Sequence, residues 1–254
     1  MKERITEILS AQKGHIGFYY RNLTTGEEIS YCGDAPFLAA SVIKLPIYMC
    51  IEKWAKEGRV SLSETVKVRE ADKVPICGAL TLFDGEPEVS IATLCRLMIS
   101  LSDNTATNLL IRRFGIDAFR EEFQKLGLKG TRLNRLLFDG KAAEAGIENT
   151  IVPSEMGMLL TQVAKGSFVD EAVSESIKDT LLLQQINHKI CGIIGDCVQV
   201  AHKTGEDENL SNDVGIVYAK QPFVICFAGY DTDVPVFEDV IRHISYDVFT
   251  ECNM

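Results

Sequence analysis

The sequence predicts an α+β fold in which an antiparallel sheet is assembled from both ends of the chain and a helical part from its middle. Two observations lead to this prediction. Segments rich in β-formers, separated by turn residues, occur near the N-terminus and again after residue 197, whereas helical periodicity dominates between them. We therefore expect one domain, 1–254, with a sheet subdomain (1–40 with 190–254) and a mostly helical subdomain (41–189), and an active site between them.

The individual elements follow in chain order. Residues 1–9 place charged and apolar groups at helical spacing, which predicts an amphipathic helix and not a secretion signal. A hairpin is expected around the turn at Thr24-Thr25-Gly26. Helical patterns then run from Ser41 to about Leu183. The expected strands are 15–20, 28–31, 198–203, 214–219 and 223–230. The expected helices within and after this part are 91–101, 105–114, 117–126, 153–165 and 236–249.

Composition excludes some classes of function. The 254 residues are 46% hydrophobic, enough for a sizeable core, and carry a net charge of −10. No basic cluster is present, which argues against nucleic acid as a partner because phosphate binding needs concentrated Lys and Arg. No apolar run approaches the roughly 20 residues that a membrane-spanning helix needs. We expect a small-molecule substrate, no nucleic acid and no membrane; the sequence leaves the oligomeric state open.

The chain has eight cysteines and four histidines. Six cysteines lie in or beside apolar stretches, where a thiol behaves as a small hydrophobe. Cys191 and Cys197 flank a Gly-rich turn, but neither paired CxxC motifs nor interleaved histidines suggest zinc. We therefore predict reduced, structural thiols, which favours a reducing compartment, and no metal and no cofactor. His202 is expected to be structural, since no Gly-x-Ser-x-Gly elbow accompanies any histidine.

The segment Ser41-Val42-Ile43-Lys44 opens a long apolar run. A serine and a lysine three residues apart on a helix lie on the same face, within contact of each other. At the start of a helix, free backbone N–H groups and the helix dipole stabilise developing negative charge, which suits a nucleophilic serine. The alternative is a serine N-cap with a surface lysine. Ser10 and Lys13 have the same spacing but end a charged segment, so we expect them to be solvated.

Two further motifs follow in order, Ser102-Asp103-Asn104 and Lys203-Thr204-Gly205. The trio is the signature of class A β-lactamases and penicillin-binding proteins. The chain resembles a class A β-lactamase-type serine hydrolase over nearly its whole length. Further stretches carry the likeness: 99–110, 131–135, 152–156 and 212–215. The resemblance implies the β-lactamase/transpeptidase-like fold.

The resemblance also implies a role for each motif residue. Ser41 is expected to be the nucleophile, Lys44 the nearest base, and Ser102 a proton relay to the leaving nitrogen. Burial and a second cation, supplied by Lys203, would favour the neutral form of Lys44. Asn104 is expected to hold the substrate's side-chain amide and to help fix Lys44. For Asp103 we favour stabilisation of the turn through backbone hydrogen bonds.

The third motif is expected to bind substrate. The family uses Lys203 and Thr204 to hold a substrate carboxylate, whereas strand alternation sends Lys203 and Gly205 to one face and His202 and Thr204 to the other, so a local twist is expected. Gly205 leaves room for the substrate backbone. The oxyanion hole of such enzymes corresponds here to the backbone N–H groups of Ser41 and Glu206.

One stretch departs from the family. Two residues after Arg135, where the family has the glutamate that activates the deacylating water, this chain has Leu137, which cannot act as a base. Asp139, Glu144 or Glu148 could replace it from a rearranged loop. Asn149 stands where the family has an aspartate that pairs with the loop arginine, so Arg135 is expected to lack its partner and the loop to be looser.

Three functions remain open at this point. The first is a β-lactamase-family hydrolase with slow or altered turnover on a β-lactam or a related amide. The second is a penicillin-binding-like peptidase or transpeptidase, for which Leu137 is no handicap when an amine accepts the acyl group. The third is a β-lactam sensor that stays acylated. The start of the chain predicts a cytoplasmic protein, or a secreted or periplasmic one if a leader was removed.

Overall fold

The computed structural model describes residues 1–254 and has the predicted α+β order. The strands are β1 (His15–Asn22), β2 (Glu28–Tyr31), β3 (Phe37–Leu38), β4 (Thr65–Lys67), β5 (Glu88–Ser90), β6 (Thr150–Ile151), β7 (Val200–Asp207), β8 (Leu210–Val217) and β9 (Phe223–Tyr230). The α-helices are α1 (Lys2–Ser10), α2 (Lys44–Lys56), α3 (Ile91–Ser100), α4 (Asn104–Phe114), α5 (Ile116–Lys125), α6 (Gly140–Glu144), α7 (Pro153–Ala164), α8 (Glu171–Leu181), α9 (Cys191–Ile194) and α10 (Val234–Glu251).

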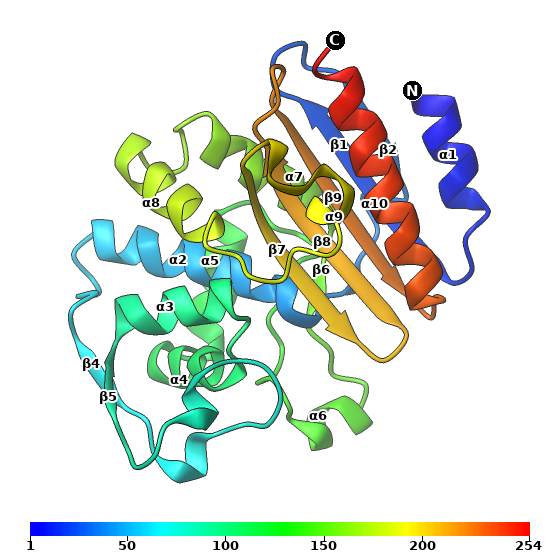
Figure 1. Cartoon of the computed structure of the whole chain (residues 1–254). Helices are drawn as coiled ribbons and strands as arrows, with labels where there is room; N and C mark the ends of the chain where they lie inside the picture. Colours follow the sequence, from blue (N-terminus) through cyan, green and yellow to red (C-terminus); the bar gives the residue numbers. More distant parts are fainter.

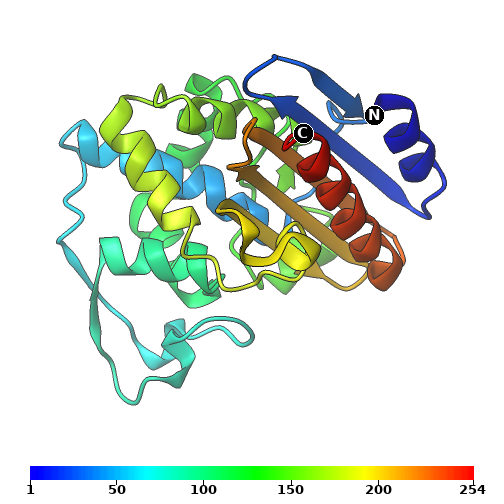
Figure 2. The same cartoon turned by 45° about the horizontal axis from the view of Figure 1, so that its top comes forward.

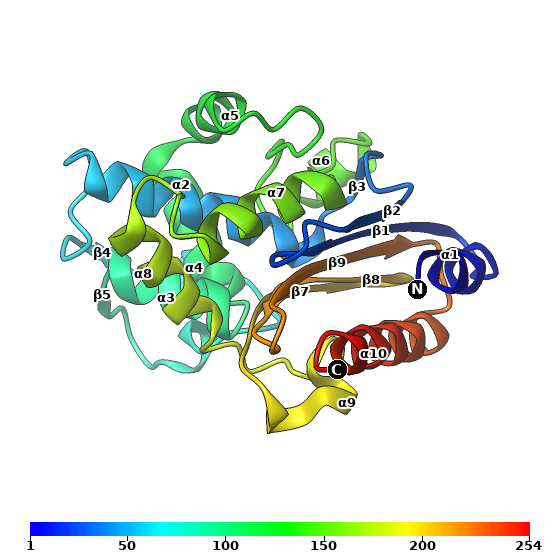
Figure 3. The ribbon, with the colours of Figure 1, turned by 90° about the horizontal axis from the view of Figure 1, so that it is seen from above.

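The central sheet is antiparallel and has the order β2-β1-β9-β8-β7, so strands from the two ends of the chain meet at β1 and β9. Seen from above, the sheet separates a body of helices, α2 to α8, from α1, α9 and α10 on the opposite face (Figure 3). Figure 1 shows α10 lying along the sheet with α1 beside it, and Figure 2 shows α10, in red, along the sheet from a second direction. The terminal helices therefore close one face of the sheet, and the other face is left to the middle of the chain.

Two hydrophobic clusters fill the spaces on either side of the sheet. The larger, of 42 buried residues, joins the helical body to the sheet and contains Trp54 and Val214. The smaller, of 19 residues, packs α1 and α10 against the other face through residues such as Phe18 and Ile241. Alternation along the strands explains this division, since neighbouring residues of a strand point to opposite faces. The division into subdomains at residues 40 and 190 stays a prediction.

Some boundaries differ from the sequence prediction. β7 and β8 extend to a shared turn at Glu208 and Asn209, so residues 204–207 and 210–213 are strand and not loop. Asn212 and Asp213 concealed this, because two polar residues in succession interrupt the apolar pattern, yet both side chains are fully buried. The pairs β3 with β6 and β4 with β5 contain two or three residues per strand, too few to give a periodic signal.

The cysteines are more exposed than their sequence context suggested. All eight are free thiols in this structure, and Cys50, Cys95, Cys226 and Cys252 are buried as expected. Cys32 and Cys77, however, are exposed, and both occupy left-handed backbone positions, at φ 47° and 60°, in irregular segments outside the helices and strands. No helix combines the length and apolar character needed to cross a bilayer.

Candidate active site

Ser41 lies in a single turn of 3-10 helix, Ala40–Ile43, that leads directly into α2. The turn is held from the sheet side by Asn212 of β8, whose Nδ2 donates to the carbonyl oxygens of Leu38 and Ala39 at 2.9 and 3.1 Å. Ala40 adopts a left-handed conformation, φ 41°, which is unusual for a residue with a Cβ and turns the chain into the helix. Ser41 is half-buried, in contrast to the fully buried residues that follow it in the helix.

Lys44, the first residue of α2, brings the motifs together. Its Nζ lies 2.9 Å from Ser41 Oγ and 2.9 Å from Ser102 Oγ. It also donates to the Ser102 carbonyl and to Asn104 Oδ1, both at 2.7 Å. The side chain is completely buried, and this burial, followed by the charge of Lys203, holds the pKa of Lys44 well below its ordinary value. A neutral amine in contact with a serine hydroxyl can accept its proton.

Ser102 and Asn104 come from the junction between α3 and α4. Ser102 has a left-handed backbone, φ 54°, which directs the junction toward Lys44. Asn104 Nδ2 donates to the Ile76 carbonyl at 2.7 Å, so its amide is fixed at both ends. Asp103 has the predicted turn-stabilising contacts: its carboxylate accepts the N–H groups of Ala106 and Leu80 at 2.8 and 2.9 Å. Its role in the turn is confirmed.

Lys203 reaches the same point from β7. Its Nζ donates to Ser102 Oγ at 3.2 Å and to the Thr204 carbonyl at 2.9 Å, and its side chain is fully buried. Burial is the largest influence on this ammonium, and it lowers the pKa of Lys203 to about 7 although Asp213 acts in the opposite direction. Two lysines thus flank one serine hydroxyl, and burial favours the neutral form of both.

The edge of β7 runs past the Ser41 turn at Gly205. A methyl group on Gly205 would lie 3.0 Å from the Ala39 carbonyl oxygen and 3.2 Å from the Ser41 amide nitrogen, so only glycine fits without displacement. Pairing of β7 with β8 is unbroken from Val200 to Asp207. No bulge supplies the expected local twist, and strand alternation sets Thr204 on the face opposite to Lys203.

The loop that follows Arg135 differs from the prediction made for it. Arg135 does not lack a partner, since its guanidinium donates to Glu148 Oε2 at 2.6 and 3.0 Å. Asn149 instead accepts the backbone N–H groups of Asn134 and Arg135 at 2.7 and 3.0 Å. An amide thus stands where the resemblance led us to expect an aspartate, and the adjacent Glu148 forms the ion pair with Arg135. The loop is therefore tied at both sides and is not loose.

Hydrogen bonds hold the backbone of Leu137, and its side chain makes apolar contacts. The Asn108 side chain on α4 accepts the Leu137 N–H and donates to the Leu137 carbonyl, both at 2.9 Å. The leucine side chain packs against the large hydrophobic cluster. Among the three carboxylates considered as replacement bases, Asp139 caps α6, Glu148 binds Arg135 and Glu144 is exposed. None forms a hydrogen bond or ion pair with Ser41 or Lys44.

The other residues considered from the sequence, Ser10, Lys13 and His202, lie outside this site. Ser10 and Lys13 are exposed, as expected for the motif without a buried helix. His202 points away from Lys203 and binds Asp213 on the other face of β7. Sequence reasoning missed Asn212, which holds the Ser41 turn. An Asn-Asp pair beside an apolar strand segment was the available signal.

Comparison with known proteins agrees with this geometry. A sequence model described as "Beta-lactamase enzyme family" matches residues 1–251. Beta-lactamase ROB-1 of Haemophilus influenzae is 27% identical over 173 residues, which is 67% of this chain but only 56% of ROB-1, so the match spans about half of that relative. The solved structure of PBP-A is 29% identical with a TM-score of 0.89, covering 98% of this chain and 94% of PBP-A.

A leucine-to-glutamate mutant of PBP-A, described as an acyl-enzyme complex with penicillin G, has the same identity and TM-score and covers 98% of this chain and 95% of its own. The family match extends over almost every residue, and the fold matches that of solved family structures. The chain belongs to the β-lactamase enzyme family and has the β-lactamase/transpeptidase-like fold of its class A members.

Proposed function

We propose that this protein is a serine hydrolase that forms an acyl-enzyme on Ser41 with β-lactams or related small amides and releases the acyl group slowly. The observation that carries the proposal is the position of Lys44. Its amine contacts both Ser41 Oγ and Ser102 Oγ at 2.9 Å in a fully buried setting. Lys44 thus connects a nucleophile to a proton donor without any histidine.

Acylation follows from these contacts. Neutral Lys44 accepts the proton of the Ser41 hydroxyl as Oγ attacks the carbonyl carbon. The negative charge that develops on the carbonyl oxygen is stabilised by the backbone N–H groups of Ser41 and Glu206. The amide C–N bond then breaks, Ser102 donates its proton to the leaving nitrogen, and Lys44 returns the first proton to Ser102. The product is a Ser41 ester with an opened ring still attached.

Substrate binding is assigned to the rim of the same site. The ammonium of Lys203 is proposed to hold a substrate carboxylate, without the expected help of Thr204, whose side chain lies on the opposite face of β7. Asn104 is proposed to hold the substrate's side-chain amide, and Gly205 leaves the edge of β7 free for the substrate backbone. The exposed Glu206 carboxylate lies one residue further along the strand and is expected to disfavour substrates with several negative charges.

Slow deacylation is proposed because water lacks a base. Leu137 packs into the core, and each nearby carboxylate of the loop is engaged elsewhere or exposed. The same observation favours a second candidate, a penicillin-binding-like peptidase or transpeptidase. In that case an amine, a better nucleophile than water, attacks the ester with Lys44 as the base of both steps. A permanently acylated β-lactam sensor is the limiting case in which neither acceptor reacts.

A chromogenic cephalosporin tests the proposal. We expect a stoichiometric burst of hydrolysed chromophore, a Ser41 adduct in intact-protein mass spectra, and a slow steady state. Ser41→Ala should abolish burst and adduct, whereas Ser10→Ala, in the matched but exposed motif, should change neither. Absence of both adduct and hydrolysis in the native chain excludes the β-lactam function.

Leu137→Glu tests the missing base separately. The variant should leave the burst unchanged and raise the steady-state rate, because a carboxylate at this position can activate water over the ester. Leu137→Gln is the matched control, polar and of equal length but without basicity. An equal steady-state rate in the two variants contradicts the explanation. A faster rate with amine acceptors than with water in the native chain decides for the peptidase.

A further inference from the structure

A second group of reactive side chains lies on the opposite face of β7 from the Ser41 site. Cys191 Sγ is 3.5 Å from His202 Nε2, and His202 Nδ1–H donates to Asp213 Oδ1 at 2.9 Å. Asp213 also accepts the Ile190 N–H at 3.1 Å, which fixes its carboxylate. His202 and Asp213 are fully buried, and Cys191 is half-buried. This is the thiol–imidazole–carboxylate order found in cysteine nucleophiles.

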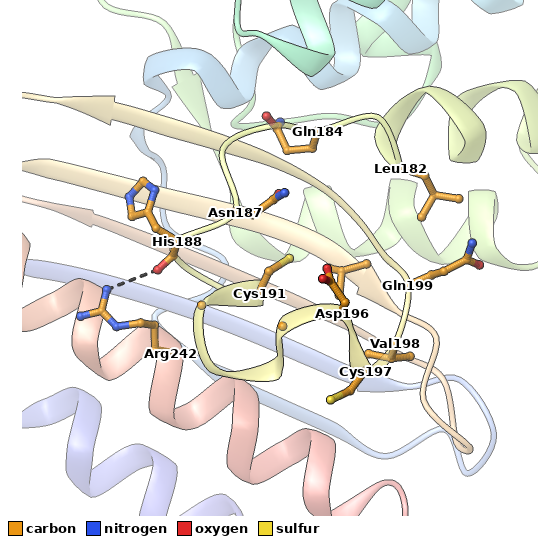
Figure 4. Close-up of a pocket in the computed structure, with 13 residues that line it drawn as sticks. Leu182, Gln184, Asn187, His188, Cys191, Asp196, Cys197, Val198, Gln199 and Arg242 are labelled. Atoms are coloured by element: carbon orange, nitrogen blue, oxygen red, sulfur yellow. Dashed lines mark hydrogen bonds between the residues drawn. The ribbon is translucent and has the colours of Figure 1, made fainter.

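The thiol opens into a pocket. A cavity of about 1090 Å³ lies beside α9, and Cys191 and Asn187 line it. In Figure 4 Asn187 lies on the loop that leads into α9, Cys191 lies where that helix begins, and Asp196 and Cys197 lie on the following turn. Gln184, Gln199 and Arg242 contribute further polar groups to the lining. A small polar molecule can therefore approach the sulfur, although the histidine behind it is closed to solvent.

We propose that Cys191, with His202 and Asp213, is a reactive-thiol site that forms mixed disulfides with small polar disulfides entering this pocket. The site is separate from the Ser41 chemistry and does not rest on it. The Asp213 carboxylate favours the protonated imidazole of His202, which lies against the Cys191 sulfur; a cation beside a thiol favours the thiolate, the reactive form in disulfide exchange. Burial opposes the charge of His202, but Asp213 outweighs it and raises the pKa of His202 to about 10.

The reaction balances without an additional redox reagent. The Cys191 thiolate attacks one sulfur of the disulfide, the S–S bond of the reagent breaks, and a new S–S bond joins Cys191 to half of it. The other half leaves as a thiolate and takes from the solvent in the pocket the proton that the Cys191 thiol gave up. Net, one thiol and one disulfide become one mixed disulfide and one free thiol, so no further oxidant is needed.

Disulfide exchange fits the site better than acyl transfer. An acyl-transfer site needs N–H donors directed at a carbonyl oxygen. Two neighbouring backbone donors are already used, since the N–H of Ile190 bonds Asp213 and that of Gly192 bonds the Lys189 carbonyl at 2.8 Å. In disulfide exchange the charge stays on sulfur, and a cation beside the attacking sulfur is the main requirement. The His202 imidazolium supplies it.

Oxidised glutathione is a suitable probe. The reduced protein is incubated with it, and each cysteine is followed by peptide mass mapping. Cys191 should form the mixed disulfide at least about tenfold faster than the more exposed Cys197, which lines the same pocket but has no histidine contact. Unfolding in denaturant should make the two rates similar. The reaction should persist in Ser41→Ala, so failure of the proposed function leaves this result untouched.

Two variants test the role of His202. His202→Gln should slow Cys191 to the rate of Cys197. Asn187→Ala should accelerate it, because Asn187 Oδ1 now accepts from His202 Nε2 at 2.9 Å and competes with the sulfur. Cys197→Ser is the control and should leave Cys191 unchanged. A native rate no faster than Cys197, or an unchanged rate in folded His202→Gln, overturns the proposal. Should His202→Gln not fold, an unchanged rate in Asn187→Ala overturns it instead.

Discussion

Lys203 makes the acylation rate of the proposed enzyme sensitive to alkaline pH. Its pKa is lowered to about 7, and in the proposed function the charged form holds the substrate carboxylate. The ammonium is present below pH 7 and is lost as the pH rises through that value. At two pH units above its pKa about one molecule in a hundred keeps the charge, so kcat/KM should fall about a hundredfold by pH 9.

Arginine at this position separates the cause from other titrations. The guanidinium does not deprotonate in this range, so Lys203→Arg should remove the alkaline fall, whatever its effect on the maximal rate. Lys220→Arg, at an exposed lysine, is the matched control and should keep the fall. The measurement is the second-order acylation constant with a chromogenic cephalosporin, taken across the pH range. An alkaline limb that is identical in Lys203→Arg refutes the assignment to Lys203.

Three further predictions concern one position in the site, one in the neighbouring loop and one in the helical body. Gly205→Ala should lower the acylation rate roughly a hundredfold in the burst assay, because its methyl displaces the Ser41 turn, with the secondary structure unchanged by circular dichroism. Glu148→Gln should speed limited proteolysis within 136–147, since Arg135 loses its carboxylate; equal cleavage contradicts this. Glu122 accepts hydrogen bonds from Lys53 and Trp54, and its pKa is lowered to about 2. The stability that its carboxylate contributes is therefore present above pH 4.5 and is lost as the pH falls toward 2. Glu122→Gln should accordingly show a flatter dependence of unfolding on acid pH.

Much of the fold was predictable because its signals are local. Strands 28–31 and 223–230 match β2 and β9 residue for residue, since each is a β-rich run bounded by turn residues. The helices match within a few residues. The three motifs also predicted that Ser41, Lys44, Ser102 and Lys203 share one site, and the structure brings their side chains into contact. Their catalytic roles remain proposals.

The features that escaped prediction depend on the path of the chain in space. Glu148 pairs with Arg135 because the loop returns beside it, and 13 residues of separation carry no periodic signal. Cys191 and His202 lie on different elements and meet only because α9 folds back on β7. A sequence pattern reports which face of its own element a residue occupies. It does not report which side chain of another element arrives there.

Because the register of β7 is unbroken, this one strand contributes side chains to the Ser41 site on one face and to the Cys191 site on the other. Lys203 faces the Ser41 site and its neighbour His202 faces the Cys191 pocket, so the separation between them is a single peptide unit. A slip of the strand by one residue would exchange their faces. The imidazole would then be presented to Ser102 and the ammonium to Asp213, and both sites would be dismantled together while the overall architecture survived.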